Sequence, residues 1–385
     1  PETRSIAMNP TNEPPLRVGL VINPEAGLGG RIGLKGSDGA EVKAKAKAAG
    51  ATAQAQNRVE QALEPLRPSQ GRIDWYAAGG QMGENVLRRL GMMPKVVSTH
   101  EDATAASDTK LAVAKLQAQS IDLLVFAGGD GTARDVLDAI APNQVALGIP
   151  CGVKMHSGVF AQHPLATAQI IQDLIAKRLV SGVIGEVRDI DEAAFRDDRV
   201  EAKFYGEMLI PDALRYIQAT KVGGRESDAL VVEEIAAGYI EAMDSEVIYF
   251  MGGGRTVGSV MRALGLSNTL LGIDVVRGGE LLQSDANEQD LLVWAGQSVC
   301  RILVSVIGGQ GHIFGRGNQQ LSAAVLQAVG TNQVDVVATK SKLASLRNGI
   351  LIVDTGDAEV DSAMMGLRPV VTGYQDNVLI RVGSV

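Results

Sequence analysis

Between residues 18 and 150, short apolar runs alternate with longer amphipathic stretches. The apolar runs have the length of β-strands and lie at 18–22, 73–77, 95–98, 121–127 and 145–149. The stretches between them are predicted to be helices and lie at 41–66, 84–90, 101–119 and 133–140. This alternation predicts βαβ units and a parallel sheet, with ligand-binding loops at the carboxyl ends of the strands.

The pattern after residue 150 predicts a second α/β or α+β domain. Its expected elements are a helix at 161–179, exposed strand and turn structure at 186–203, a helix at 227–243, and two strand–glycine-loop–helix units at 247–264 and 302–329. A hairpin is expected at 271–282, turning at Gly278 and Gly279, and short strands at 334–338, 350–353, 369–372 and 378–382.

These elements divide the chain into three expected parts. Residues 1–15 are a flexible tail without an apolar segment, and residues 16–155 form an α/β phosphate-binding domain. Residues 156–385 form the second domain, whose C-terminal strands are candidates to return to the first.

Composition narrows the class of protein. Forty-five glycines against 4% aromatic residues suit an α/β protein with many tight turns. A net charge of −8 argues against nucleic acid or an anionic membrane as the main partner, although a nest of backbone N–H groups can still bind a small anion. Two distant cysteines fit a reducing compartment, and no segment approaches the roughly 20 apolar residues of a membrane helix. We therefore expect a soluble cytoplasmic protein.

The strongest chemical signal is the Gly-Gly-Asp-Gly-Thr segment at 128–132, which follows an apolar strand and precedes a helix expected to start at Ala133. Glycines let a phosphate chain approach the backbone, and a helix N-terminus supplies N–H donors. Asp130 repels phosphate, so its presence suggests that it orients a hydroxyl nucleophile, takes its proton or holds Mg²⁺. The structural alternative is a helix cap formed by Asp130 or Thr132.

Four segments together resemble a known family. They are the segment 128–132, Asn23-Pro24-Glu25-Ala26-Gly27-Leu28-Gly29-Gly30-Arg31, the run from Gly148 to Ser157, and the run from Ile307 to Gln320. The chain resembles, from about residue 18 to its C-terminus, the ATP-NAD kinase family, in the branch that includes acetoin catabolism protein X.

The resemblance implies a Rossmann-like NAD-kinase-type domain followed by the second domain. It also implies phosphoryl transfer from ATP or polyphosphate, with Mg²⁺, to a ribose hydroxyl of NAD, giving NADP. In that scheme Asp130 is catalytic, no residue is assigned as a metal ligand, and the protein is a homo-oligomer, either a dimer or a tetramer. The nucleotide- or phosphate-binding candidates are Asn23, Lys35, Gly128, Gly129, Gly131, Thr132, Lys154, Gly252, Gly253, Gly254, Arg255, Thr256 and Asn318.

Several of these candidates have a second interpretation. Lys35 belongs to a glycine-rich loop at 27–39, which is either a lid over the donor or uninvolved. Lys154 suits phosphate contact as a point charge, and His156 either transfers a proton or is structural. The segment 252–256 offers backbone donors and the Arg255 guanidinium, or is a tight turn with Arg255 in solvent. The segment 308–320, with Asn318, either contacts adenine or ribose or packs between domains.

The chain departs from typical NAD kinases in its second domain. The Asn-Glu pair and the Gly-Ser-Thr-Ala-Tyr segment that contact NAD in that family are not found at the expected place, and residues 251–258 are the nearest counterpart of the latter. The acceptor therefore stays open. The alternatives are a kinase of the same fold acting on a lipid diol or another nucleotide, and a non-catalytic nucleotide-binding regulator linked to acetoin catabolism.

Overall fold

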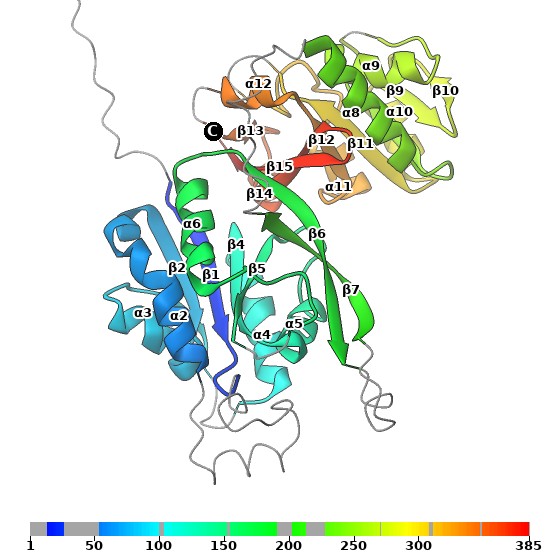
Figure 1. The fold of residues 1–385 in the computed structure, drawn as a ribbon. Coiled ribbons are helices and arrows are strands. Elements are labelled where there is room, and N and C mark those ends of the chain that lie inside the picture. Colours follow the sequence, from blue (N-terminus) through cyan, green and yellow to red (C-terminus); the bar gives the residue numbers. More distant parts are fainter. Residues whose placement is uncertain are drawn as a thin grey trace, which may run out of the picture.

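The computed structural model describes residues 14–26, 54–99, 104–151, 155–190, 202–212, 228–269, 271–307, 311–346 and 349–384. The chain is an α/β protein built on two sheets, one in each half (Figure 1). The predicted fold class is therefore confirmed, whereas the domain boundaries stay a prediction.

The first sheet is parallel and has the strand order β3-β2-β1-β4-β5. Its strands are β1 (Leu16–Ile22), β2 (Ile73–Ala78), β3 (Lys95–Ser98), β4 (Leu123–Gly128) and β5 (Ala146–Pro150). All five agree with the apolar runs to within two residues. In the strands other than the edge strand β3, this is because a strand covered on both faces is apolar at successive positions. Every residue of β4 is buried.

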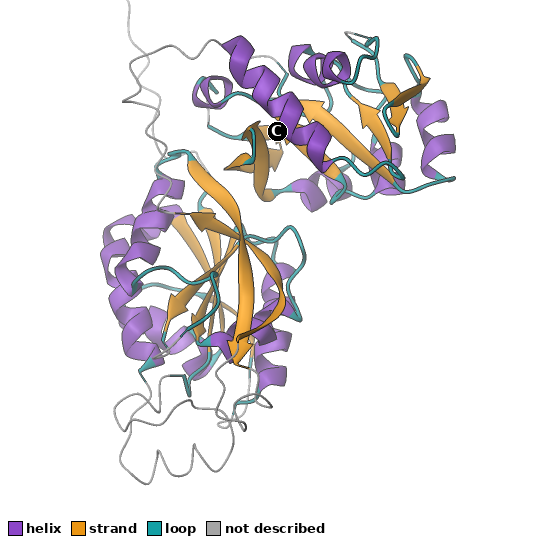
Figure 2. Cartoon of the chain, turned by 45° about the vertical axis from the view of Figure 1, so that its right-hand side comes forward, coloured by secondary structure: helices purple, strands orange, loops and turns teal. Residues whose placement is uncertain are grey.

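Helices cover both faces of this sheet (Figure 2). One face carries α2 (Ala55–Leu63), α3 (Glu84–Arg89) and α6 (Pro164–Ile175), together with the 3₁₀ segment η2 (Glu64–Arg72). The 3₁₀ segment η3 (Gly80–Met82) contributes Met82 to the core of the opposite face. The other face carries α4 (Ala106–Gln117) and α5 (Asp130–Leu137). The helix predicted at 41–66 is present from Ala55, and residues 41–53 lie outside the described residues.

The second sheet is mixed, with ten strands and the main order β10-β9-β8-β11-β12-β14-β15-β6-β7. Its strands are β6 (Val180–Ile190), β7 (Ala202–Asp212), β8 (Ile248–Met251), β9 (Asp274–Arg277), β10 (Glu280–Gln283), β11 (Cys300–Ser305), β12 (Val334–Val337), β13 (Leu351–Val353), β14 (Gly366–Gly373) and β15 (Asp376–Ser384). Its helices are α8 (Asp228–Ala242), α9 (Arg255–Ala263), α10 (Glu288–Ala295), α11 (Ala323–Val329), α12 (Lys340–Ala344) and α13 (Ala358–Met364). The predicted turn at Gly278 and Gly279 is confirmed, and both glycines have positive φ.

The β6–β7 hairpin departs from the sequence expectation. Exposed strand and turn structure was expected at 186–203, yet Val187 is fully buried and Asp189 is 9% exposed. The reason is that the hairpin packs against the first half, where Val187 and Met208 share a core cluster with Phe126 of β4. At its other end β6 pairs with β15 of the second sheet. The hairpin thus connects the two halves of the chain.

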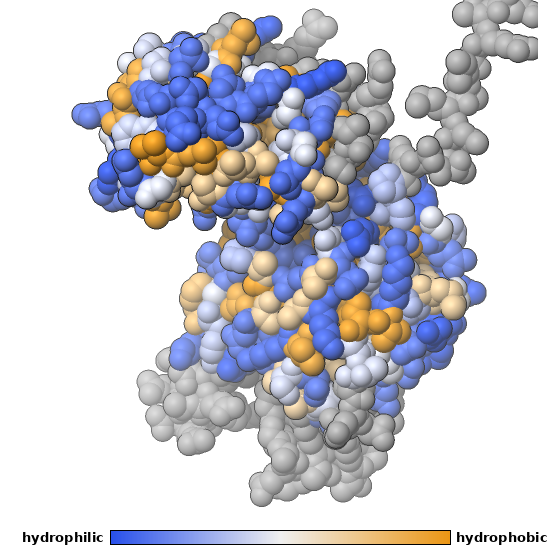
Figure 3. All heavy atoms as spheres, turned by 180° about the vertical axis from the view of Figure 1, so that it is seen from behind, coloured by the Kyte–Doolittle hydropathy of each residue, from blue (hydrophilic) through white to orange (hydrophobic). Residues whose placement is uncertain are grey.

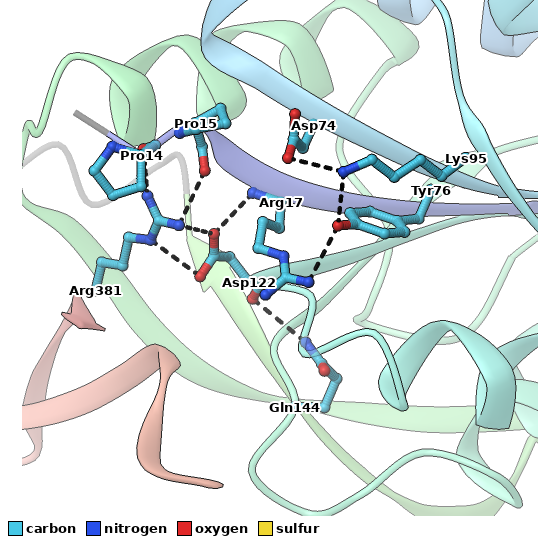
Figure 4. A network of polar contacts seen from close by, with 9 residues as sticks. All are labelled: Pro14, Pro15, Arg17, Asp74, Tyr76, Lys95, Asp122, Gln144 and Arg381. Carbon is cyan, nitrogen blue, oxygen red and sulfur yellow. Dashed lines mark hydrogen bonds and ion pairs between the residues drawn. The ribbon is translucent and has the colours of Figure 1, made fainter. Parts of the chain in front are cut away.

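An ion pair joins the halves at the amino end of the first sheet (Figure 4). Asp122, which immediately precedes β4, is 2% exposed and accepts the backbone N–H of Arg17 at 2.8 Å. Arg381 of β15 donates its Nε to Asp122 at 3.2 Å and its terminal nitrogens to the carbonyls of Pro14 and Pro15 at 2.7 and 2.9 Å. Burial raises the pKa of the Asp122 carboxyl, and the guanidinium opposes that shift.

The surface seen from behind is largely polar, with apolar residues scattered in small patches (Figure 3). Within the described residues, no helix combines the length and the apolar character needed to cross a membrane.

We predict that Arg381→Met destabilises the fold in a pH-dependent way. The change leaves the Asp122 carboxylate buried without its cation, which costs roughly 3–5 kcal/mol of unfolding free energy. Because the pKa of Asp122 is then raised further in the folded state only, stability falls as pH rises through that pKa and recovers below the unfolded-state value. Urea unfolding should show a larger deficit at about pH 7 than at about pH 4.5. A smaller deficit is expected in Asp122→Asn/Arg381→Met, and an equal deficit at both pH values would contradict the assignment.

Candidate functional site

The first sheet has a topological switch point between β1 and β4. From β1 the chain proceeds to β2 and β3 on one side, and it then crosses to β4 and β5 on the other. The two strands run parallel, and Ile22 lies opposite Ala127. Ligands of open α/β sheets bind in the crevice beyond the carboxyl ends of strands at such a point. The residues that directly follow β1 and β4 therefore define the candidate site.

Asn23 connects the two strand ends. Its backbone N–H donates to Ala127 O at 2.9 Å, and its Nδ2 donates to Thr132 Oγ1 at 3.0 Å. Its Oδ1 accepts the backbone N–H of Glu25 at 3.1 Å. Thr132 is 4% exposed, so its hydroxyl is held by Asn23 in a largely dry position. Asn23 thereby fixes the first turn of α5 relative to β1.

Asp130 is held by the segment that follows β5. Its Oδ2 accepts the backbone N–H of His156 at 2.8 Å, and its Oδ1 accepts that of Ser157 at 3.0 Å. The Nδ1 of His156 lies 3.2 Å from the same Oδ2. Asp130 is 8% exposed, and a carboxylate so deeply placed needs such donors. Since a carboxylate offers about four acceptor positions, Oδ1 has one that none of the described residues fills and that a ligand can use.

Gly128 and Gly129 are glycines for different reasons. A Cβ on Gly128 would lie 2.2 Å from Thr132 Oγ1 and 2.4 Å from its Cβ, so packing alone requires glycine there. A Cβ on Gly129 would meet no atom of the described residues within 4 Å. The open space beside Gly129 lies next to the N-terminus of α5, where backbone N–H groups favour an anion.

The start of α5 corrects two expectations. The helix begins at Asp130 rather than at Ala133, so Asp130, Gly131 and Thr132 form its first turn. The capping interpretation of Asp130 or Thr132 is wrong, because α5 has no side-chain cap hydrogen bond and Asp130 faces His156 and Ser157 instead.

Cys151 lies beside the site but is not a nucleophile at neutral pH. Its backbone N–H donates to Gly128 O at 3.0 Å. Burial raises the pKa of its thiol to about 12, which keeps the sulfur protonated.

Comparison with protein families agrees with this geometry. The chain matches the ATP-NAD kinase N-terminal domain over residues 18–179 and the ATP-NAD kinase C-terminal domain over residues 244–382. It belongs to the ATP-NAD kinase family. A search of curated proteins gave no match. The resemblance to this family is confirmed, whereas its acetoin catabolism branch stays a prediction.

The predicted site residues of this ATP-NAD kinase family member fall into three groups. Asn23, Gly128, Gly129, Asp130, Gly131 and Thr132 come together at the switch point. Lys35, the loop at 27–39 and Lys154 lie outside the described residues. Gly252, Gly253, Gly254, Arg255, Thr256 and Asn318 lie in segments that follow strands of the second sheet, the first five between β8 and the first turn of α9 and Asn318 after β11.

The loop between β8 and α9 has its own local geometry. Gly254 has φ +111° and precedes α9, which starts at the exposed Arg255. A Cβ on Gly252 would lie 2.9 Å from Leu303 O of the neighbouring β11, and Ser305 Oγ donates to Gly253 O at 3.2 Å. The glycines here are thus explained partly by close strand packing, while Arg255 is at a helix N-terminus.

Asn318 is buried in the segment after β11. Its Nδ2 donates to Ile313 O at 2.8 Å, and it is 3% exposed. Its Oδ1 has no hydrogen-bond partner in the structure, and the same is true of Nδ1 of His312. The hydrogen bond to Ile313 shows that Asn318 stabilises its own loop, whereas a contact with adenine or ribose stays a prediction.

The two glycine loops lie far apart within one chain. The strand β15 of the second sheet meets the first half at Asp122, Pro14 and Pro15, which are at the amino ends of β1 and β4. Asp130 follows the carboxyl end of β4, and the six residues of that strand span about 20 Å. Figure 1 likewise shows α9 over the second sheet, away from α5.

Sequence reasoning missed the contribution of the hairpin to the site. Arg134 of α5 pairs with Asp189 of β6 at 3.0 Å and lies 4.2 Å from the ring centre of Tyr205 on β7. Ser157 Oγ donates to Arg188 O at 2.7 Å. A signal existed only for Arg134, which is four residues after Asp130 and hence on the same helix face.

We predict that alanine lowers the free energy of unfolding at one of the two neighbouring glycines and not at the other. Gly128→Ala should lower the unfolding free energy by about 1–3 kcal/mol, because the new Cβ overlaps Thr132. Gly129→Ala should leave it nearly unchanged, because its Cβ enters open space at φ −116°. Thermal unfolding of both variants checks this, and a Gly129→Ala loss as large as that of Gly128→Ala would show that our account of the turn is wrong.

Proposed function

We propose that the protein transfers a phosphoryl group from ATP or polyphosphate to a ribose hydroxyl of NAD, giving NADP. The observation that carries this proposal is the Asp130 carboxylate at the switch point, which three nitrogen groups hold and whose Oδ1 has one acceptor position that no described residue fills. Membership in the ATP-NAD kinase family supports the same reaction type.

Asp130 is suited to orient and deprotonate an attacking hydroxyl. The N–H groups of His156 and Ser157 fix the carboxylate plane, so Oδ1 points in one direction without conformational search. A hydroxyl that donates to Oδ1 is placed for attack on the donor phosphorus, and Asp130 takes its proton. Phosphoryl transfer depends mainly on such positioning and on charge stabilisation.

The phosphates are proposed to lie beside Gly129. The open space at its Cα and the N-terminus of α5 provide close backbone approach and a favourable dipole. Asn23 contributes by holding Thr132, and Gly131 by exposing the first turn of the helix. Lys35 and Lys154 are proposed as cationic partners of the same phosphates on sequence grounds.

The residues fit a Mg²⁺ ion held by the nucleotide rather than by a protein cage. Within the described part of the chain, no group of three or more His, Cys, Asp and Glu side chains could hold a metal ion. Mg²⁺ commonly keeps several waters and binds substrate phosphates, so the donor's phosphates and water would hold the ion, and the remaining acceptor position of Asp130 stays with the attacking hydroxyl. When bound, the ion neutralises charge on the phosphates.

The second-sheet loop is proposed as a separate phosphate contact. Gly252, Gly253, Gly254 and Thr256 surround Arg255 at the start of α9, a helix of nine residues. A guanidinium at a helix N-terminus suits a phosphate or carboxylate oxygen. Because this loop and Asp130 of the same chain lie far apart in space, we propose that the loop contacts a nucleotide bound at Asp130 of another subunit in a homo-oligomer. A cytoplasmic location and the link to acetoin catabolism remain proposals from the sequence.

We predict that Asp130→Asn lowers the turnover number for NAD phosphorylation by about 10²–10⁴-fold, because the amide cannot take the hydroxyl proton. The measurement is phosphorus NMR of a matrix that combines ATP and polyphosphate with NAD, NADH and other nucleotides. The amide NH₂ also faces an N–H of His156 or Ser157, which costs about 1–3 kcal/mol, so thermal unfolding must be followed in parallel.

Asp173→Asn is the matched control for Asp130→Asn. Asp173 is also a buried carboxylate, 4% exposed. It lies in α6 and pairs with Arg178, which follows that helix. It should lose stability and keep its turnover number. Full activity of Asp130→Asn would exclude the proposed role. If the wild-type protein phosphorylates another acceptor but not NAD, that acceptor replaces NAD in the proposal. Tight nucleotide binding by the wild type without any turnover would favour the non-catalytic nucleotide-binding regulator.

We predict that Arg255→Gln raises the KM of one nucleotide substrate roughly tenfold or more, through loss of a charge-assisted hydrogen bond. The side chain is exposed, so the melting temperature should not change. Arg262→Gln, an exposed arginine in the last turn of the same helix, is the control. Steady-state kinetics with ATP and NAD varied separately decide the matter, and equal KM values in both variants would remove Arg255 from the site.

A further inference from the structure

The β6–β7 hairpin lies between the two family-matched segments, yet it contacts the candidate site. The matches end at residue 179 and resume at 244, and the hairpin strands occupy Val180–Ile190 and Ala202–Asp212. The two strands pair along nearly their whole length, from Ser181↔Asp212 to Ile190↔Ala202. A long element that neither family segment includes therefore packs against the helix that carries Asp130.

Ser157 links the hairpin to Asp130 through adjacent atoms. Its backbone N–H donates to Asp130 Oδ1 at 3.0 Å. Its Oγ donates to Arg188 O at 2.7 Å and accepts Arg188 N–H at 3.0 Å. The next residue, Gly158, donates its N–H to Glu186 O at 2.8 Å. Ser157 is 9% exposed, so water competes little for these bonds.

This connection occurs where the hairpin ladder is irregular. The register of β6 and β7 shifts between Val187 and Arg188. Ser157 Oγ satisfies both backbone groups of Arg188 at this shift, which a second strand would otherwise do. The same residue therefore serves two structures, the strand irregularity and the carboxylate.

A second anchor holds the hairpin to α5 itself. Arg134 pairs with Asp189 at 3.0 Å, and its guanidinium lies 4.2 Å from the centre of the Tyr205 ring. Gly206 approaches Leu137 so closely that a Cβ there would lie 2.8 Å from Leu137 Cδ2. The helix that carries Asp130 and the segment after β5 that binds its carboxylate are thus both attached to one hairpin.

We propose that Ser157 is a positioning residue for phosphoryl transfer and that the β6–β7 hairpin, through Ser157, sets the orientation of the Asp130 carboxylate. This inference rests on the proposed function. Because β6 continues into the second sheet through β15, the hairpin also couples Asp130 to the second half of the chain. Through Asp130, Ser157 and the hairpin affect the position of the attacking hydroxyl and not the binding of the phosphates beside Gly129.

The test is Ser157→Ala in the full-length protein. Loss of Oγ leaves the backbone N–H and carbonyl of Arg188 without their Ser157 partner and loosens the 156–158 segment. The backbone N–H of residue 157, which donates to Asp130, remains. The turnover number should fall about tenfold or more with little change in the KM for ATP, because positioning of the attacking group is lost rather than phosphate binding. Ser259→Ala is the control, since Ser259 is 7% exposed and bonds Arg255 O and Arg262 on α9.

Asp189→Asn provides an independent variant that touches neither Asp130 nor Ser157. It weakens the Arg134 anchor, so it should lower the turnover number in the same direction. The double variant Ser157→Ala/Asp189→Asn should lose less than the product of the two single losses, because both act by seating one hairpin. A double loss equal to that product would overturn the shared mechanism.

Amide hydrogen exchange over residues 155–158 separates this inference from the proposed function. In Ser157→Ala, but not in Ser259→Ala, these amides should exchange about tenfold faster or more, whatever reaction the protein catalyses. Faster exchange with no NAD phosphorylation by the wild type would reject the proposed function and keep the coupling of hairpin and carboxylate. A turnover number within twofold of wild type, or unchanged exchange, would overturn the role of Ser157.

Discussion

The satisfied burial of the Asp130 carboxylate is the constraint on which the rest of the site depends. A carboxylate that is 8% exposed needs donors, and the chain provides them from the segment after β5 rather than from its own helix. Three strand ends must therefore converge at one point: β1 through Asn23, β4 through the turn itself, and β5 through His156 and Ser157. The parallel sheet makes that convergence possible, because its carboxyl ends share one edge.

The hairpin and the Arg381 ion pair hold the two halves of the molecule at opposite ends of the first sheet. Arg381 reaches Asp122 before β4, and the hairpin reaches α5 after β4. Both attachments involve carboxylates that are almost buried, Asp122 and Asp189, each compensated by an arginine. Breaking either pair leaves a charge with little water, which is more costly than loss of an exposed ion pair. The second half is thus tied to the strand that leads into the turn carrying Asp130.

The strands and most helices were predictable because their signals are local. Apolar runs of four to seven residues located every strand of the first sheet. For the four strands other than the edge strand β3, the reason is that a parallel strand covered on both faces is apolar at consecutive positions. The hairpin turn at Gly278 and Gly279 was likewise predictable, because positive φ favours glycine. The errors arose where local signals compete. The start of α5 was placed at Ala133 because glycines suggest a loop, yet Asp130 to Thr132 are helical once Asn23 and Ser157 hold their side chains.

The sequence by itself determined that three glycines, one carboxylate and one hydroxyl come together at 128–132 directly after a strand, and that the chain resembles the ATP-NAD kinase family. Only the tertiary structure decided what each of those residues does. Gly128 makes room for Thr132, whereas Gly129 faces open space, although the two are identical in sequence. The partners of Asp130 lie 26 and 27 residues away, and the hairpin anchor of α5 lies 55 residues away. Such contacts depend on how strand ends and faces meet in space, and no local pattern of polar and apolar positions encodes that meeting.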